Sequence, residues 1–156
     1  MRFESTNRWL TLLANVGVLV GIAVLVYEIR QNTLATELDV AASYENTFAE
    51  IELLIAGDPE FAELLTKGIN GDDVSQVDQL RLTAFYRRVL RTWQFIHYQY
   101  LTGALEEYLW QGQREGMLQT FLADKGLRDS WRANKGRYFD QFNSLLDRFD
   151  ERVIVE

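Results

Sequence analysis

The sequence contains no cysteine, only one proline and only one histidine. Without cysteine there can be no disulfide framework, thiolate metal site or cysteine nucleophile. The single proline, Pro59, leaves long stretches of chain unbroken, which favours helix throughout. We also find no P-loop, no G-x-S-x-G and no EF-hand sequence. No catalytic motif is present, so the sequence gives no reason to expect an enzyme.

Basic residues are in short supply. The 156 residues carry a formal net charge of −7. Setting aside Arg2, Arg8 and Arg30 with Glu4 and Glu28 leaves 13 basic and 21 acidic residues, a net charge near −8. Nucleic acids are bound through clustered Lys and Arg, so we expect no nucleic-acid partner. An acidic domain should also not lie flat on an anionic lipid leaflet.

One long hydrophobic run stands near the N-terminus. Residues Trp9 to Tyr27 carry no charge, and with Glu28 and Ile29 they span about 30 Å as a helix, enough to cross a bilayer core. Trp9 and Tyr27 stand at its ends, where amphipathic rings prefer the headgroup level. A cleavable signal peptide is the rival interpretation, but residues 27–30 offer no small-residue cleavage site. We therefore predict a tail and transmembrane anchor over residues 1–30 and a soluble helical domain over 31–156.

The membrane orientation follows from few charges. Arg2, Arg8 and the terminal amine precede the span, whereas only Arg30 closely follows it. The positive-inside rule then predicts a cytoplasmic N-terminus and a periplasmic domain in a bacterial inner membrane.

The anchor carries residues that favour contact with other helices. Ala14, Gly17 and Gly21 share one face, and the G-x-x-x-G spacing allows a second helix to approach closely in lipid. Asn15 lies about a third of a turn away and can hydrogen-bond to a neighbouring helix. Glycine is also simply common in membrane helices. We predict that these four residues contact other membrane helices.

Beyond the anchor, apolar residues recur every three or four positions. One such face comprises Leu34, Leu38, Ala41, Tyr44, Phe48, Ile51 and Ile55. The Gly57–Pro59 stretch should end this helix and cap the next at Asp58, with that second helix ending at Lys67 before Gly68. Ser75 with Asp78 is a weak capping box for a third helix, Gln76 to Thr102.

The third helix and those after it complete an all-α architecture. The expected apolar stripe of the third helix is Leu82, Phe85, Val89, Trp93, Ile96 and Tyr100. A fourth helix should span Leu105 to Ala123, followed by a short helix and a final amphipathic one. The last carries Tyr138, Phe142, Leu145, Phe149 and Val153. The predicted fold is a single N-terminal transmembrane helix that continues into a small helical bundle.

Charges are segregated along the chain. Eleven acidic residues and one lysine lie between Glu37 and Asp78, and Arg81, Arg87, Arg88 and Arg91 follow without an intervening acid. The simplest interpretation is that the acidic segment pairs with the arginine helix inside the molecule. A partner-binding role for the arginines is the alternative.

Two features of the third helix could serve binding. His97 lies beside Trp93 on the apolar stripe, and a lone histidine there is more often a core residue than a ligand. The alternative is ligation of a haem or chlorophyll-like cofactor, although no second histidine and no Glu-x-x-His pair occurs. We expect no cofactor.

The second feature lies on the opposite face of the same helix, where Arg88, Arg91, Phe95 and Tyr98 cluster. Arginine beside aromatic residues is typical of protein interface centres. A central helix that buries both faces in the bundle would show the same pattern.

Taken together, the residues Glu28–Thr33, Gly57–Pro59 and Tyr98–Gly103 are the basis of a family resemblance. The chain resembles a family of uncharacterised bacterial single-pass membrane proteins whose hydrophobic span runs into an EIRQNT-like motif. The resemblance covers most of the chain, implies an anchored helical architecture and supplies no catalytic residues. The position of the motif suggests that Gln31 and Asn32 cap or kink the helix at the membrane surface.

We therefore expect a non-catalytic accessory or scaffolding subunit of a larger membrane complex, respiratory or photosynthetic in the most plausible cases. Its partners would be the membrane and other membrane-protein subunits. Two alternatives remain open: a homo-oligomeric pore or sensor built from copies of this chain, and a ligand-binding helical domain that uses His97.

Overall fold

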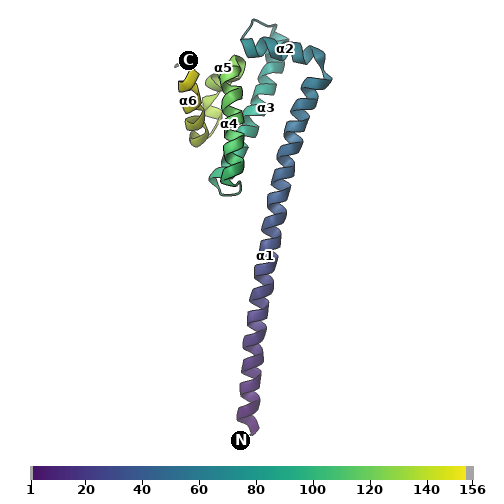
Figure 1. Ribbon diagram of the computed structural model, residues 1–156, viewed down its shortest axis with the longest axis vertical. Coiled ribbons are helices and arrows are strands. Elements are labelled where there is room, and N and C mark those ends of the chain that lie inside the picture. The colour runs from purple at the N-terminus through teal and green to yellow at the C-terminus, as the bar shows by residue number, and fades with distance from the viewer. Residues whose placement is uncertain (1, 154–156) are drawn as a thin grey trace. The chain divides into compact units, whose positions relative to one another are not determined.

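A computed structural model describes the backbone of residues 2–153 (Figure 1). Side chains are described for 9, 12–36, 42, 46, 48–153 of these. The predicted positions Leu38, Ala41 and Tyr44 lie outside the described side chains. All regular elements of the described backbone are helical: α1 (Arg2–Gly57), α2 (Pro59–Asn70), α3 (Gln76–Leu101), α4 (Glu107–Ala123), α5 (Lys125–Ala133), a 3₁₀ turn η1 (Lys135–Arg137) and α6 (Asp140–Val153). The predicted all-α fold class is confirmed.

The chain divides into two compact units, Met1–Glu45 and Asn46–Glu156. In the first unit, the stretch Leu12–Thr36 of α1 is long and apolar enough to cross a membrane, with a mean hydropathy of 2.2. All its side chains are exposed. Signal sequences near an N-terminus satisfy the same criteria of length and composition. The predicted division at residues 30 and 31 stays a prediction.

Helix α1 runs through Gln31 and Asn32 without interruption, so the expected cap at these residues is wrong. The local hydrogen bonds continue the helix: the Gln31 amide donates to the Tyr27 hydroxyl at 2.7 Å. The hydroxyls of Thr33 and Thr36 donate to backbone carbonyls one turn earlier. Polar side chains at this position therefore bond along the helix rather than ending it.

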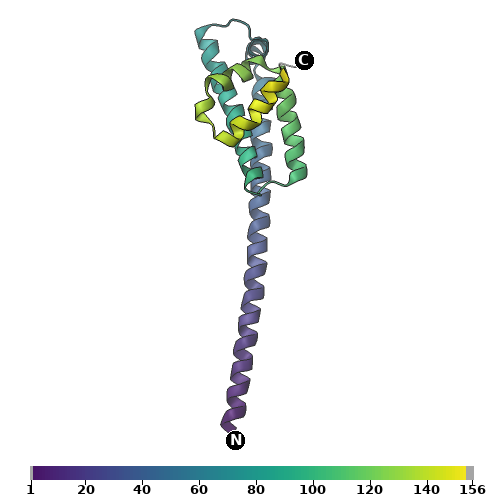
Figure 2. The ribbon, with the colours of Figure 1, turned by 90° about the vertical axis from the view of Figure 1, so that its left-hand side faces the viewer.

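The second unit is a bundle in which α3 packs against α2, α4 and α5, and α6 packs against α4 (Figure 2). Its core is apolar and aromatic. The side chains with almost no exposed surface include Leu90, Ile96, Phe121, Leu127, Trp131, Phe142, Leu145, Leu146 and Phe149. Burial of such large side chains from several helices is the main stabilising contribution to a domain of this size.

The predicted starts of α2 and α3 are confirmed. The Asp58 carboxylate accepts a hydrogen bond from the Phe61 amide at 3.0 Å, with Pro59 as the first residue of α2. The Ser75 hydroxyl caps α3 in the same way by accepting from the Asp78 amide. These side chains satisfy amide groups that have no partner within the helix.

The predicted end of α2 is wrong. The helix continues through Gly68 and ends at Asn70, and Gly71 follows with a φ of 74°, a conformation that glycine adopts without strain. Gly68 is instead a packing residue. A Cβ there would lie 2.6 Å from the Tyr86 hydroxyl and 2.9 Å from a Leu82 methyl group.

Two further expectations need correction. Helix α4 begins at Glu107 rather than Leu105, which is buried in the connection.

The buried stripe of α3 is also displaced from the predicted one. It comprises Leu82, Tyr86, Leu90, Trp93, Ile96 and His97, whereas Phe85, Val89 and Tyr100 are only half-buried. The stripe lies there because α3 packs on three neighbours and not on one.

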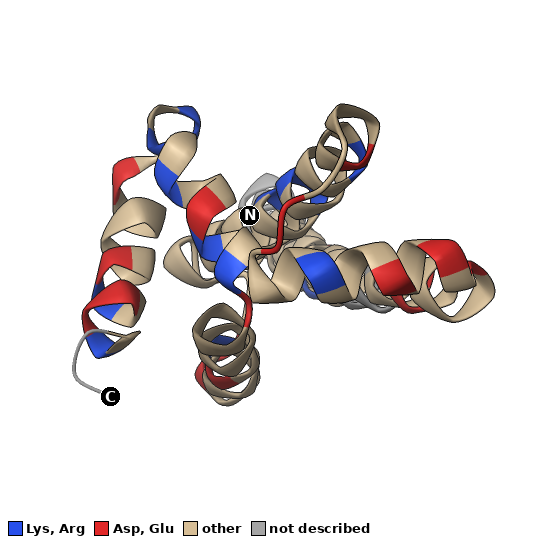
Figure 3. Ribbon diagram, turned by 90° about the horizontal axis from the view of Figure 1, so that it is seen from above, with Lys and Arg blue, Asp and Glu red and all other residues tan. Residues whose placement is uncertain are grey.

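Ion pairs on the surface of the bundle join α5 and η1 to α6. Arg132 pairs with Asp150 at 2.6 Å, and Lys135 pairs with Asp147 at 2.6 Å. Figure 3 shows acidic and basic residues along α6, which ends near the mark C. Exposed pairs of this kind contribute little individually, about 0–1 kcal/mol each.

Candidate functional site

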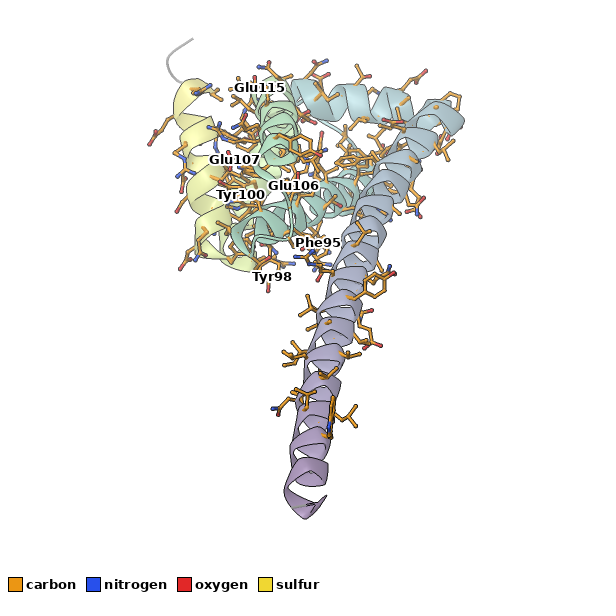
Figure 4. The ribbon with its side chains drawn as sticks, turned by 60° about the horizontal axis from the view of Figure 1, so that its bottom comes forward. Phe95, Tyr98, Tyr100, Glu106, Glu107 and Glu115 are labelled. Carbon is orange, nitrogen blue, oxygen red and sulfur yellow. The ribbon has the colours of Figure 1, made fainter. Side chains whose placement is uncertain are left out.

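The four residues predicted to contact a partner form one exposed stripe along α3. Arg88, Arg91, Phe95 and Tyr98 are all exposed, with 45% of Phe95 and 52% of Tyr98 accessible. Figure 4 shows Phe95 and Tyr98 on the C-terminal half of this helix. The stripe lies away from the buried positions of α3, so this part of the helix does not bury both faces in the bundle.

Part of the arginine run is used within the bundle. Arg81 pairs with Asp58 at 3.4 Å, and Arg88 pairs with Glu50. Both acids come from the acidic segment, so the intramolecular interpretation of the charge pattern holds for these two arginines. The side chains of these pairs remain 40% to 64% exposed. They orient elements more than they stabilise the fold.

His97 is buried, with 5% of its surface exposed. Its ring stacks on Trp110 at 5.1 Å between centroids and on Phe139 at 5.9 Å, with Phe142 nearby at 6.1 Å. Its Nδ1 atom is buried without a hydrogen-bond partner among the described residues. Burial lowers the pKa of His97, and the positive charge of Arg148 lowers it further. The imidazole is therefore a neutral part of the aromatic core.

The aromatic stack continues from His97 to the surface. Tyr100 stacks on Trp110 with centroids 4.8 Å apart and rings 12° from parallel. A hydrogen bond with Glu107 raises the pKa of the Tyr100 hydroxyl. The stack therefore ties the last turn of α3 to the first turns of α4, where Figure 4 shows Glu106 and Glu107.

Next to this stack lies a surface that the sequence analysis did not predict. We define the α3–α4 edge as Leu101, Glu106, Glu107, Tyr108 and Leu109. Its apolar members are well exposed: 49% of Leu101, 68% of Tyr108 and 43% of Leu109. The signal in the sequence was weak because these residues interrupt the helical period at the connection between two helices.

A cleft between α2, α3 and α5 was also not predicted. It encloses about 320 Å³, and its lining includes Gly68, Gly71, Asp72, Tyr86, Lys125 and Asp129. Two of its charged groups already pair with each other: Lys125 and Asp129 lie 2.8 Å apart. The ion pair and the close backbone packing give the lining a structural role.

The wall of this cleft contains a close crossing of α2 and α5. A Cβ on Gly126 would meet the Gly68 carbonyl oxygen and the Tyr86 hydroxyl. Behind the crossing, Tyr86 and Asp124 are buried. Burial raises the pKa of both groups, and the charge of Asp124 raises that of Tyr86 further. Asp124 accepts a hydrogen bond from the Leu127 amide at 2.9 Å, which caps α5.

The predicted membrane contacts lie on the exposed stretch of α1. Ala14, Asn15, Gly17 and Gly21 are all exposed. A Cβ built on Gly17 or Gly21 meets no atom within 4 Å. Nothing described in this chain covers the small-residue face, so it is open to a second helix.

Comparison with protein-family models, curated proteins and solved structures gives no match. The resemblance noted from the sequence motifs therefore stays a prediction, and function has to be argued from the chain itself.

Proposed function

We propose that this chain is a non-catalytic accessory or scaffolding subunit of a larger membrane complex, held in the bilayer by the apolar stretch of α1. The observation that carries the proposal is the stretch Leu12–Thr36. It is 25 residues long, and no part of its most apolar window is buried in the structure. So much exposed apolar surface on one helix is stable in lipid and unfavourable in water.

The anchor supplies the first contact surface. Exposed Gly17 and Gly21 allow another helix to approach closely, and Asn15 offers a hydrogen bond across the helix interface. In a membrane, packing and hydrogen bonds of this kind replace the hydrophobic effect as the reason for helix association. The partner is a transmembrane helix of another subunit.

The bundle supplies the second contact surface, the α3 stripe of Arg88, Arg91, Phe95 and Tyr98, in which Arg88 also pairs with Glu50. Arginine and tyrosine are enriched among residues that carry binding energy at protein interfaces. Arg91 and Tyr98 are exposed on the same side of α3. An extrinsic protein domain would bind there, in the periplasm if the N-terminus is cytoplasmic and the membrane is a bacterial inner membrane. Respiratory and photosynthetic complexes are the hosts that suit such a subunit.

The test is to replace the small residues of the anchor with a bulky one. Gly17→Leu with Gly21→Leu should release the chain from its complex, because two leucines prevent the close approach of helix backbones. The measurement is co-migration of the tagged chain with other subunits in a native gel after mild detergent extraction. The matched control is Val16→Leu with Ala23→Leu, which adds bulk on a different face of the same helix and should leave co-migration unchanged.

Unchanged co-migration of the glycine double variant would contradict the proposed helix contact. Recovery of this chain only, at a multiple of 18.2 kDa, would instead establish the homo-oligomer. A visible absorption band in the purified protein would establish the cofactor-binding alternative at His97.

A further inference from the structure

The α3–α4 edge combines exposed apolar groups with carboxylates. Leu101, Tyr108 and Leu109 expose between 43% and 68% of their surface within about two turns of the connection. Glu106 and Glu107 lie among them, and no described ion pair includes either one. Among the described residues, Glu107 accepts hydrogen bonds from two neutral groups, the Gln111 amide at 3.1 Å and the Tyr100 hydroxyl. The edge is therefore apolar, aromatic and negatively charged.

Two ion pairs within the bundle show at which end of the bundle the α3–α4 edge lies. Asp58 pairs with Arg81 and Glu50 pairs with Arg88, so α3 runs antiparallel to the residues 46–57 that enter the bundle. Leu101 is thirteen residues beyond Arg88, about 20 Å along the helix. Within the second unit, the edge therefore lies at the end of α3 that is on the side of Asn46.

The same end is tethered to the apolar stretch. Thr36, the last residue of that stretch, is ten residues from Asn46. Ten residues reach at most about 35 Å fully extended and about 15 Å as a helix. If Leu12–Thr36 spans the bilayer, as proposed above, Asn46, where the bundle begins, must stay within this distance of the lipid headgroups.

We propose that the α3–α4 edge rests on the headgroup layer of the membrane and prefers zwitterionic lipids that carry an ammonium group. Tyrosine and leucine side chains are favoured at the boundary between headgroups and acyl chains. The carboxylates of Glu106 and Glu107 attract the ammonium groups, and the exposed Tyr108 ring adds a cation–π surface. Anionic lipids are disfavoured because both carboxylates repel them.

The natural absence of cysteine makes the edge directly measurable. Three single-cysteine variants of the full chain, Tyr108→Cys, Asp73→Cys and Val20→Cys, are labelled with a polarity-sensitive fluorophore. Each is reconstituted into phosphatidylcholine and phosphatidylethanolamine vesicles with and without headgroup spin-labelled lipid. All three positions are exposed, and Asp73 precedes α3 at the other end of that helix.

The label at position 108 should show a blue shift and loss of fluorescence on addition of spin-labelled lipid, whereas the label at 73 should show neither. The label at 20 lies near the middle of the apolar stretch, beyond the reach of headgroup spin labels, so it reports lipid contact of the anchor through its blue shift. Lipid contact at 20 without contact at 108 overturns this inference and leaves the anchor intact. Absence of contact at 20 overturns the proposed anchoring itself.

Charge reversal tests the lipid preference. With Glu106→Lys and Glu107→Lys added to Tyr108→Cys, quenching should become stronger in vesicles that contain phosphatidylglycerol, whereas the unreversed chain should lose quenching there. An unchanged lipid preference would contradict the role of the carboxylates. The label at 108 could also remain unquenched while the cysteine at that position crosslinks to a second copy of the chain. That result would overturn the lipid contact and assign the edge to self-association.

Discussion

At the scale of single residues, the buried environment of His97 changes its chemistry. The ring is enclosed by Trp110, Phe139 and Phe142, and its folded-state pKa lies below the ordinary value of 6.5. Well above pH 6.5 the imidazole is neutral in both the folded and the unfolded chain, so its burial has no pH-dependent effect on stability there. Below that pH only the unfolded chain takes up the proton readily, so the folded state loses stability.

The midpoint of thermal unfolding of the full chain in detergent should therefore fall as the pH is lowered from 7 to 5. His97→Phe should reduce this decrease, because phenylalanine stacks in the same cluster and does not titrate. The quantity to compare is the difference between wild type and variant at each pH, which removes contributions from groups common to both. A variant that keeps the full pH dependence would assign it to other groups.

Gly126 is constrained by packing, because its Cα faces the Gly68 carbonyl and the Tyr86 hydroxyl. Gly126→Ala should destabilise the bundle by about 1–3 kcal/mol, the usual cost of overpacking a close contact. The matched control is Gly112→Ala within α4, where an added Cβ meets nothing within 4 Å. That substitution should stabilise by up to about 1 kcal/mol through helix propensity. Chemical denaturation measures both, and equal effects would contradict the close crossing.

At the scale of elements, the start of α2 depends on a single side chain. Asp58 both caps the helix through the Phe61 amide and pairs with Arg81. Asp58→Ala should cost about 0.5–2 kcal/mol through loss of the cap. Asp58→Asn keeps a capping oxygen and loses only the exposed ion pair, so it should cost less than about 1 kcal/mol. Equal losses for the two variants, measured by urea denaturation, would show that the ion pair and not the cap matters.

The starts of α2 and α3 could be predicted from the sequence because their capping signals are local. Asp58 before Pro59, and Ser75 three residues before Asp78, satisfy amides within a single turn. The end of α2 could not be predicted in this way. A glycine that ends a helix and a glycine that lets two helices cross look alike in the sequence. Only the packing against Tyr86 shows that Gly68 is the second kind.

The buried face of α3 also could not be predicted from local sequence signals. Its periodicity predicted a helix close to the observed bounds, but the buried stripe contains Tyr86, Leu90 and His97 rather than Phe85, Val89 and Tyr100. A helix with neighbours on several sides has apolar residues over a wide arc, so periodicity does not select the most buried line. The α3–α4 edge was missed for a related reason, since its exposure depends on how α3 and α4 end.

At the scale of the whole molecule, the sequence predicted an apolar helix and a helical bundle, and both are present. Association with a complex cannot be predicted from one chain, because the contacts of the small-residue face of α1 and of the α3 stripe would be made with residues of other chains. Retention of Leu12–Thr36 as a membrane anchor is the first requirement of the proposed function.

The most direct test is the intact mass of the protein recovered from membranes washed with alkaline carbonate, compared with that in the soluble fraction. A retained anchor predicts the full-length chain of 18.2 kDa in the washed membranes. A shorter chain in the soluble fraction, lacking the apolar N-terminal residues, would show that the stretch is a cleaved signal and would contradict the account.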